Sequence, residues 1–268
     1  NTNFYLDKKN NDNLPIGLFG DFYSHELSFS LIDKNDYKNL KNIFEKCNLK
    51  IKKIISKNFI DGAFLIDNNL KLETFFKIQL YKDYSQLIFF ENSSLRFTQK
   101  FNFGTDIIIK DISKIVALNY DKVKNILSNS SFTEKKEENE MIEEKFFDGE
   151  NFRKIKKKLL IDIAFARITE ISDLIFFKNI NIKSLLKKDI PIFLEILDIS
   201  IYKSFQSSLQ SSFSKNNLFK FSFLDTYTQE QYYNNAYKIV QYGWKKEAVP
   251  IIQEKKSLIA RFFDLIFK

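Results

Sequence analysis

Cysteine and histidine are almost absent from this chain of 268 residues, with Cys47 and His25 as the only examples. A single cysteine cannot form an internal disulfide, which excludes a disulfide scaffold, a two-thiol redox site and a two-thiol zinc site, and favours a reducing compartment. A catalytic Ser/His/Asp or Cys/His arrangement would have to use His25, in YSHEL, and no nearby motif supports such a site. Cys47 shares helical spacing with Leu40, Ile43 and Phe44, which predicts a core residue rather than a nucleophile.

Glycine and proline are also scarce, with 6 Gly and 3 Pro. Glycine allows backbone N–H groups to approach phosphate oxygens closely, so phosphate-binding loops depend on it. The closest pair is Gly17 and Gly20, and the sequence contains neither a P-loop nor a dinucleotide fingerprint. These two classes of nucleotide-binding protein are therefore excluded.

The remaining composition is that of a folded protein with one large or two modest domains, since 44% of residues are hydrophobic and 28% are charged. The formal net charge of +8 accompanies a general bias toward Lys, Asn, Ile and Phe. A nucleic-acid partner would need basic residues gathered on one face. The runs KIKKK (154–158) and KIKKIISK (50–57) are interleaved with acids and lack a stacking motif, so no nucleic-acid partner is predicted.

The N-terminus carries a separate signal. Met141 is the only methionine, and residues 1–8 do not resemble a signal peptide. We therefore expect the chain to begin inside a longer protein.

Hydrophobic periodicity predicts a mixture of strands and helices. Residues 74–103 are typical of an antiparallel meander, because apolar residues alternate around the turns KDY and ENSS. The polar run 133–145 predicts a solvated loop. The other expected strands are 4–6, 26–32, 51–56 and 190–197; the expected helices are 37–48, 106–127, 151–177 with Asn151 as a cap, a serine-rich helix with Phe205, Leu209 and Phe213, and 228–242 before Gly243.

The last segment, EKKSLIARFFDLIFK (254–268), follows a linker that contains Pro250. At ~100° per residue its apolar side chains cover roughly 220°, a wider arc than a helix facing a protein core normally shows. The segment is shorter than the ~20 residues that span a bilayer. It predicts a helix lying on an anionic membrane, with rings in the acyl region and basic groups at the headgroups. The predicted membrane-binding residues are Lys255, Lys256, Leu258, Ile259, Arg261, Phe262, Phe263, Leu265, Ile266, Phe267 and Lys268.

Motifs along the whole chain resemble FtsA, the actin-like bacterial cell-division protein. LPIGLFG (14–20) with ELSFSLID resembles the end of the family's inserted subdomain, and LKNIFEKCNLKI (40–51) resembles the return into the first lobe. SSLRFTQKFNFGTDIIIKDI (93–112), with Gly104 and Asp111, is similar to the family's hairpin and following helix. IDIAFARITEISDLIF (161–176) and AYKIVQYG (236–243) resemble the long outer helix of the second lobe and the last helix of the body.

The resemblance implies an α/β fold with mixed sheets, of the two-lobed actin type, with an incomplete first lobe. It implies this order of parts: 1–36, end of the inserted subdomain; 37–73, part of the first-lobe core; 74–112 and 188–227, second-lobe core; 113–187, outer subdomain of the second lobe; 228–243, closing helix; 244–254, linker; 255–268, membrane-targeting helix.

It also implies a partner site for the C-terminal peptide of FtsZ at Arg167 and Glu170, with Lys157 and Lys158 upstream. A guanidinium can hold the carboxylate or main chain of a docked peptide. The alternative is that Arg167 pairs with Glu170 or Asp173 on its own helix. KIKKK can likewise attract an acidic peptide or simply form a solvated face.

ATP and Mg²⁺ are expected of the family, but its second phosphate loop, at 79–87, is altered here. Gln79 stands where an Asp is expected, and the strand at 190–197 lacks the family's glycine pair. We therefore expect little or no ATP binding, no cofactor, no metal and no catalytic residue. The other changes in the loop are Tyr81, Lys82 and Asp83 for the glycines, and Tyr84, Ser85 and Gln86 for a Thr/Thr/Asp stretch.

These observations predict a cell-division protein without ATP hydrolysis. It would link FtsZ filaments and other divisome proteins to the cytoplasmic face of the bacterial inner membrane at the division site, and self-polymerisation would multiply its membrane contacts. Two alternatives stay open. One is an actin-like ATPase completed by residues upstream of Asn1, and the other is a protein of the related pilus-assembly branch.

Overall fold

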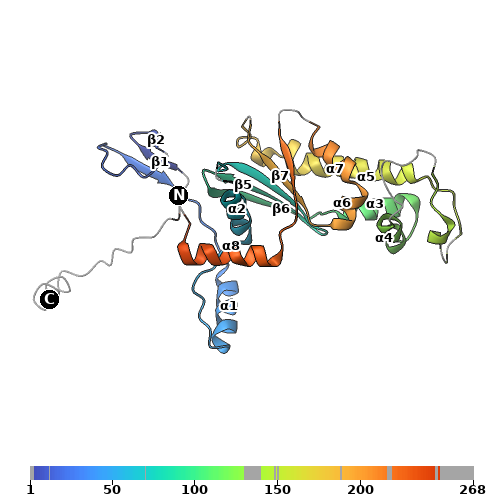
Figure 1. The fold of residues 1–268 in the computed structure, drawn as a ribbon, viewed down its shortest axis with the longest axis horizontal. Coiled ribbons are helices and arrows are strands. Elements are labelled where there is room, and N and C mark those ends of the chain that lie inside the picture. The colour runs from blue at the N-terminus through green and yellow to red at the C-terminus, as the bar shows by residue number, and fades with distance from the viewer. Residues whose placement is uncertain are drawn as a thin grey trace, which may run out of the picture.

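The computed structural model describes residues 3–11, 13–69, 71–129, 140–147, 149, 151–187, 189–215, 219–244 and 247. Its centre is a five-stranded mixed sheet in the order β6-β5-β4-β7-β8 (Figure 1). β4, β5 and β6 are antiparallel, whereas β7 and β8 run parallel to β4. The predicted α/β class with mixed sheets and the predicted meander are confirmed. The strands are β4 Phe75–Leu80, β5 Ser85–Glu91, β6 Ser94–Phe101, β7 Ile192–Ile196 and β8 Phe221–Leu224.

Helices cover both faces of this sheet (Figure 1). Because strand side chains alternate, Phe76, Ile78 and Leu80 of β4 enter the main core, while Phe75 enters a second core on the other face. The main core also contains side chains of α3 Asp106–Val116, α4 Tyr120–Ser128, α5 Lys157–Ser172, α6 Ile199–Ser204 and α7 Gln206–Phe213. α2 Lys57–Asn68 and α8 Gln229–Tyr242 lie over the second face. Short 3₁₀ turns occur at Glu144–Phe147 and Ile180–Ile182.

The closing helix α8 has the predicted ends. Thr228 and Gln231 form a reciprocal capping box at its start, and Gly243, with a φ of 75°, follows its end. α2, by contrast, was not predicted. It packs so closely on β5 that a Cβ at Gly62 would lie 2.0 Å from the ring of Phe90. Glycine at this position therefore permits a helix that its own propensity disfavours.

Two predicted helical regions have different bounds from those expected. The region 106–127 is two helices, because Ala117 adopts a left-handed φ of 50° and Asn119 caps α4 through its side chain. The predicted cap at Asn151 is wrong. α5 starts at Lys157, and its last residue is followed by a π-helical turn at Asp173–Phe177.

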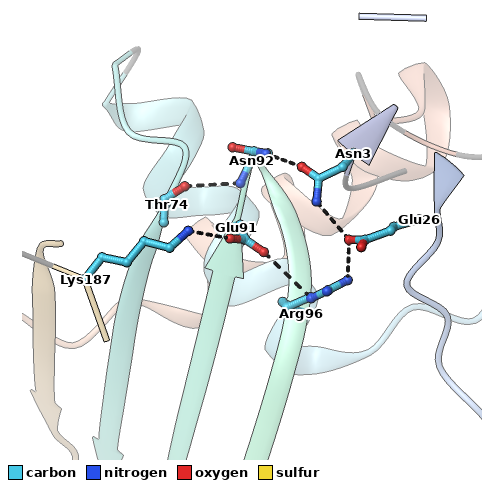
Figure 2. Close-up of polar contacts among 7 residues, drawn as sticks. All are labelled: Asn3, Glu26, Thr74, Glu91, Asn92, Arg96 and Lys187. Atoms are coloured by element: carbon cyan, nitrogen blue, oxygen red, sulfur yellow. Dashed lines mark hydrogen bonds and ion pairs between the residues drawn. The ribbon is translucent and has the colours of Figure 1, made fainter. Parts of the chain in front are cut away.

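A small separate sheet, in the order β2-β1-β3, contains the first strands: β1 Asn3–Leu6, β2 Lys9–Asn11 and β3 Tyr23–Glu26. Figure 2 shows how polar side chains join it to the β5–β6 end of the main sheet. Asn92 Nδ2 donates to Asn3 Oδ1 at 2.7 Å, and the Arg96 guanidinium lies 3.0 Å from Glu26 Oε2. Arg96 and Lys187 also contact Glu91. Partly exposed ion pairs of this kind contribute little each.

Two predicted strands are wrong, at 26–32 and 51–56. β3 ends at Glu26, and residues 27–32 and 51–56 pair with no other strand in the part of the chain that the structure describes. Alternating apolar residues favour a strand only where a neighbouring strand supplies hydrogen bonds.

α1, Lys34–Lys46, buries none of its residues, and Cys47 at its end is exposed. The prediction that Cys47 is a core residue is therefore wrong. No described helix has the length and apolar character needed to cross a bilayer. The predicted membrane-binding helix and most of its linker lie outside the described residues, and the division into subdomains stays a prediction.

Candidate functional site

The first candidate site lies at the edge of the sheet where the parallel strands β4 and β7 end. Ligands of open α/β sheets generally bind outside the carboxyl ends of parallel strands. A cleft of ≈ 420 Å³ opens there, between the β4–β5 turn, α3, α4 and the start of α6. Its polar lining residues are Tyr81, Lys82, Tyr120, Lys124, Asp198 and Ser200.

Two backbone groups at this edge that could bind phosphate are already used within the chain. The N–H groups of Thr105 and Asp106, at the start of α3, donate to the carbonyls of Tyr81 and Lys82 at 3.0 and 2.9 Å. Gly104 allows this contact, because a Cβ there would lie 2.3 Å from both carbonyl oxygens. The N-terminus of α3 therefore binds the β4–β5 turn, where in other proteins a helix N-terminus binds an anion.

Two aromatic rings occupy the turn itself. Tyr81 and Tyr84 stack with centroids 4.2 Å apart, and the ammonium groups of Lys57 and Lys100 lie over their rings at 5.1 and 4.4 Å. Lys57 Nζ also donates to the Tyr81 hydroxyl at 2.8 Å, and burial raises the pKa of Tyr81 well above its ordinary value. The aromatic turn is thus held by contacts that glycines could not make.

The altered loop residues predicted from the sequence are therefore together in one hairpin. Lys82 and Asp83 are exposed at its turn, and Ser85 begins β5 with its hydroxyl donating to Phe103 O at 2.8 Å. Gln86 follows on β5, and Gln79 is buried in β4.

Gln79 belongs to a buried polar cluster between the sheet and α2. Its Nε2 donates to Glu195 Oε2 at 2.7 Å and to Asp61 Oδ2 at 3.3 Å. Lys77 Nζ lies 2.9 Å from the same Glu195 oxygen and 4.8 Å from the ring centroid of Tyr227, although its N–H groups make no well-aligned hydrogen bond. At most 3% of each of the four polar residues, Asp61, Lys77, Gln79 and Glu195, is exposed.

Asp61 is the member of this cluster whose protonation the fold alters. Burial raises its pKa above the ordinary value of 3.8, and Glu195 adds to the effect, while Lys77, Lys57 and the Gln79 amide oppose it. Sequence reasoning missed Asp61 and Glu195, because they are 134 positions apart and only the packing of α2 on β4 and β7 brings them together.

The second candidate site is a groove of ≈ 430 Å³ between α3 and α5. Ile115, Ile163 and Ala166 supply its apolar lining, and Asp111, Asp162, Arg167 and Glu170 supply its polar groups. Arg167 Nε donates to Asp111 Oδ2, and Nη1 donates to Glu170 Oε2 at 2.6 Å. The same-helix pair with Glu170 is thus present, whereas Asp173 contacts Lys178 and Lys215 instead.

The predicted basic residues upstream are not part of this groove. Lys157 is only 5% exposed, and its Nζ contacts Glu140 Oε1 at 2.6 Å, so it is not a surface residue of the kind that was predicted. Lys158 is exposed but does not line the groove. Asp111 was noted only as part of a motif, and its contact with Arg167, 56 positions away, left no sequence signal.

Comparison with known proteins gives likenesses of shape alone. No known protein family matches the sequence, and no curated protein matches it. Among solved structures, MreB5 of Spiroplasma citri bound to ADP gives a TM-score of 0.48 at 10% identity, covering 78% of this chain and 65% of that one. The ethanolamine utilization protein EutJ of Carboxydothermus hydrogenoformans gives 0.44 at 8%, covering 71% and 57%.

A chain of the PilM–PilN type IV pilus biogenesis complex gives a TM-score of 0.38 at 11% identity, covering 73% of this chain and 52% of that one. The chain thus spans between about half and two thirds of these three proteins. Scores below 0.5 at 8–11% identity carry no argument about fold family, activity or partners, and none of these structures singles out FtsA.

The filled β4–β5 turn predicts that nucleotide does not bind. In a fluorescence titration with a labelled ATP analogue and Mg²⁺, we expect no saturable binding at micromolar concentrations, because the α3 N–H groups and the turn are already occupied. The Lys82→Glu variant controls for non-specific attraction to the cleft. Saturable micromolar binding that Lys82→Glu abolishes would contradict the prediction.

The raised pKa of Asp61 predicts that the stability of the fold depends on pH. The folded state holds this proton more tightly than the unfolded chain, so the free energy of unfolding falls as pH rises from the ordinary pKa through the raised one. Asp61→Asn removes this titration and should be more stable than the wild type at neutral pH. Urea unfolding followed by circular dichroism across the acidic range measures the effect, with Asp67→Asn, an exposed carboxyl on the same helix, as the control. A loss of stability in Asp61→Asn at neutral pH would show that the ionised carboxylate is required.

Proposed function

We propose that this chain is an actin-like membrane adaptor, similar in role to FtsA. It would bind the C-terminal peptide of FtsZ and hold it at the cytoplasmic face of the bacterial inner membrane, at the division site, without hydrolysing ATP. The observation that carries this proposal is the groove between α3 and α5, where an apolar lining adjoins a guanidinium. Such a site suits an extended or helical peptide with apolar anchors.

Arg167 can bind a peptide without losing its partners within the chain. A guanidinium has five N–H donors in a planar fork, and the contacts with Asp111 and Glu170 use Nε and Nη1. These carboxylates also hold the side chain in one position, which lowers the entropy lost when a ligand binds. A peptide carbonyl or carboxylate can then approach Nη2.

The membrane end of the proposed adaptor rests on the sequence of 254–268. Two adjacent phenylalanines, Phe262 and Phe263, lie among basic residues in a segment too short to span a bilayer. The altered β4–β5 turn supports a role in binding rather than in nucleotide chemistry. Other divisome proteins, and self-polymerisation, would add contacts at the same membrane.

The partner site is tested by reversing the charge of Arg167. We expect Arg167→Glu to weaken binding of an FtsZ C-terminal peptide by about 1.5–3 kcal/mol, the range for hydrogen bonds to charged groups, because it removes the guanidinium donors and adds a fourth carboxylate to the groove. Fluorescence anisotropy of the labelled peptide measures this. Lys238→Glu makes the same charge change on α8 and should leave binding unchanged. Equal binding by Arg167→Glu and wild type, with the same circular dichroism, would reject the site.

The membrane end is tested by flotation with vesicles that contain anionic lipid. The full chain should float with the vesicles, and the chain lacking 254–268 should stay in the dense fraction, because burial of each large apolar side chain contributes about 1.5–3 kcal/mol. Phe262→Asp with Phe263→Asp should behave like the truncated chain while keeping its length. Flotation of the truncated chain to the same extent as the full chain would contradict a tether built on this segment.

A further inference from the structure

Helix α1 stands apart from both sheets (Figure 1), and none of its residues is buried. At ~100° per residue, its apolar side chains and that of Cys47, just beyond its end, fall within an arc of roughly 120°. Three of these residues, Tyr37, Ile43 and Phe44, are 41%, 61% and 38% exposed. An arc of this width is typical of a helix that packs against a protein core. α1 therefore presents a packing face that no part of the described chain covers.

The segment that leads into α1 also exposes apolar side chains. Leu27, Phe29, Leu31 and Ile32 are all exposed, with Phe29 at 79% and Leu31 at 88%. Single exposed apolar residues are ordinary, but contiguous groups of them mark interaction sites.

Charge limits what can cover this face. Residues 33–53 contain seven lysines and three acidic residues, Asp33, Asp36 and Glu45, a formal excess of four positive charges. Two of these lysines are in ion pairs, Lys41 with Glu45 and Lys53 with Glu247. A second copy packed face to face would bring two such excesses together. The chain's own segment 254–268 has four basic and two acidic residues, so it is repelled as well. The complementary surface is one that carries carboxylates.

The distribution of charge within α1 favours a polypeptide over a lipid. Asp36 falls inside the apolar arc, where an anionic headgroup layer would repel it, whereas a protein surface can supply a single cation opposite it. Lys34, Lys38 and Lys41 lie together beside one border of the arc. A membrane-surface helix normally has a face dominated by lysine and arginine, but the polar face of α1 also carries Asn35, Asn39 and Asn42.

We propose that the apolar face of α1 docks on a polypeptide surface that is apolar at its centre and bears carboxylates at its rim. The contact would bury the side chains around Ile43 and Phe44 and place Lys34, Lys38 and Lys41 against the acidic rim. It is independent of the α3–α5 groove and of the membrane segment, so its failure would leave the proposed function untouched.

The test uses the full chain and a labelled synthetic helical peptide whose leucine face is bordered on both sides by glutamates. Anisotropy should show salt-sensitive binding that weakens at least about tenfold in Ile43→Asp, the effect expected for a central apolar contact. Asn42→Asp makes the same charge change on the polar face and should leave the affinity nearly unchanged. Both residues are exposed, so both variants should melt like the wild type. A peptide with lysines in place of glutamates should bind more weakly.

Four results would overturn the proposal. These are no binding of the acidic peptide, equal binding of the acidic and basic peptides, equal binding by Ile43→Asp and Asn42→Asp, and vesicle binding or self-association that Ile43→Asp abolishes and Asn42→Asp does not. Vesicle binding of this kind would assign the face to lipid, and self-association of this kind would assign it to a second copy.

Discussion

The burial of β4 on both faces is the constraint on which the rest of this structure depends. All six residues of the strand are buried, and two of them, Lys77 and Gln79, are polar. A buried ammonium is tolerated only with an opposite charge close by. The parallel register of β4 and β7, which pairs Gln79 with Glu195, brings that carboxylate within 2.9 Å of Lys77 Nζ. The polar cluster thus ties the order of the parallel strands to the position of α2, whose Asp61 completes it.

β4 also determines the structure of the turn at its carboxyl end. β4 leads directly into the turn whose two carbonyls accept hydrogen bonds from N–H groups at the start of α3, and Gly104 makes that approach sterically feasible. An edge that commonly binds ligands is instead consolidated by main-chain hydrogen bonds and by the Tyr81–Tyr84 stack. The two surfaces for which partners are proposed are helical instead: the groove between α3 and α5, and the uncovered face of α1.

Sequence reasoning succeeded where the signal was local. The alternation over β4 to β6 and the stop of α8 at Gly243 are short-range patterns, and the structure follows them. Sequence reasoning failed where residues distant in the sequence determine the local structure. Leu27, Phe29 and Leu31 alternate as in a strand, but no described strand lies beside them. α2 was missed because Gly62 argues against a helix until Phe90 is seen against it.

The candidate sites likewise differ in how much of each could be predicted from the sequence. The hairpin was predictable, because a turn between two alternating strands is visible in the sequence, whereas the replacement of glycines in it rests on the resemblance to FtsA. The cluster of Asp61, Gln79 and Glu195 was not, since its members come from three elements.

The net charge of +8 describes neither proposed partner surface, because the two surfaces differ in local charge. Around α1 the lysines dominate, whereas the α3–α5 groove sets three carboxylates around one guanidinium. Arg167 is therefore not a free cation awaiting an acidic ligand, because Asp111 and Glu170 already neutralise it. A peptide that binds there gains more from directional hydrogen bonds to the guanidinium and from apolar anchors beside Ile115 and Ile163 than from its net charge. An acidic peptide without such anchors would meet Asp162 and the two carboxylates, and charge alone would repel it.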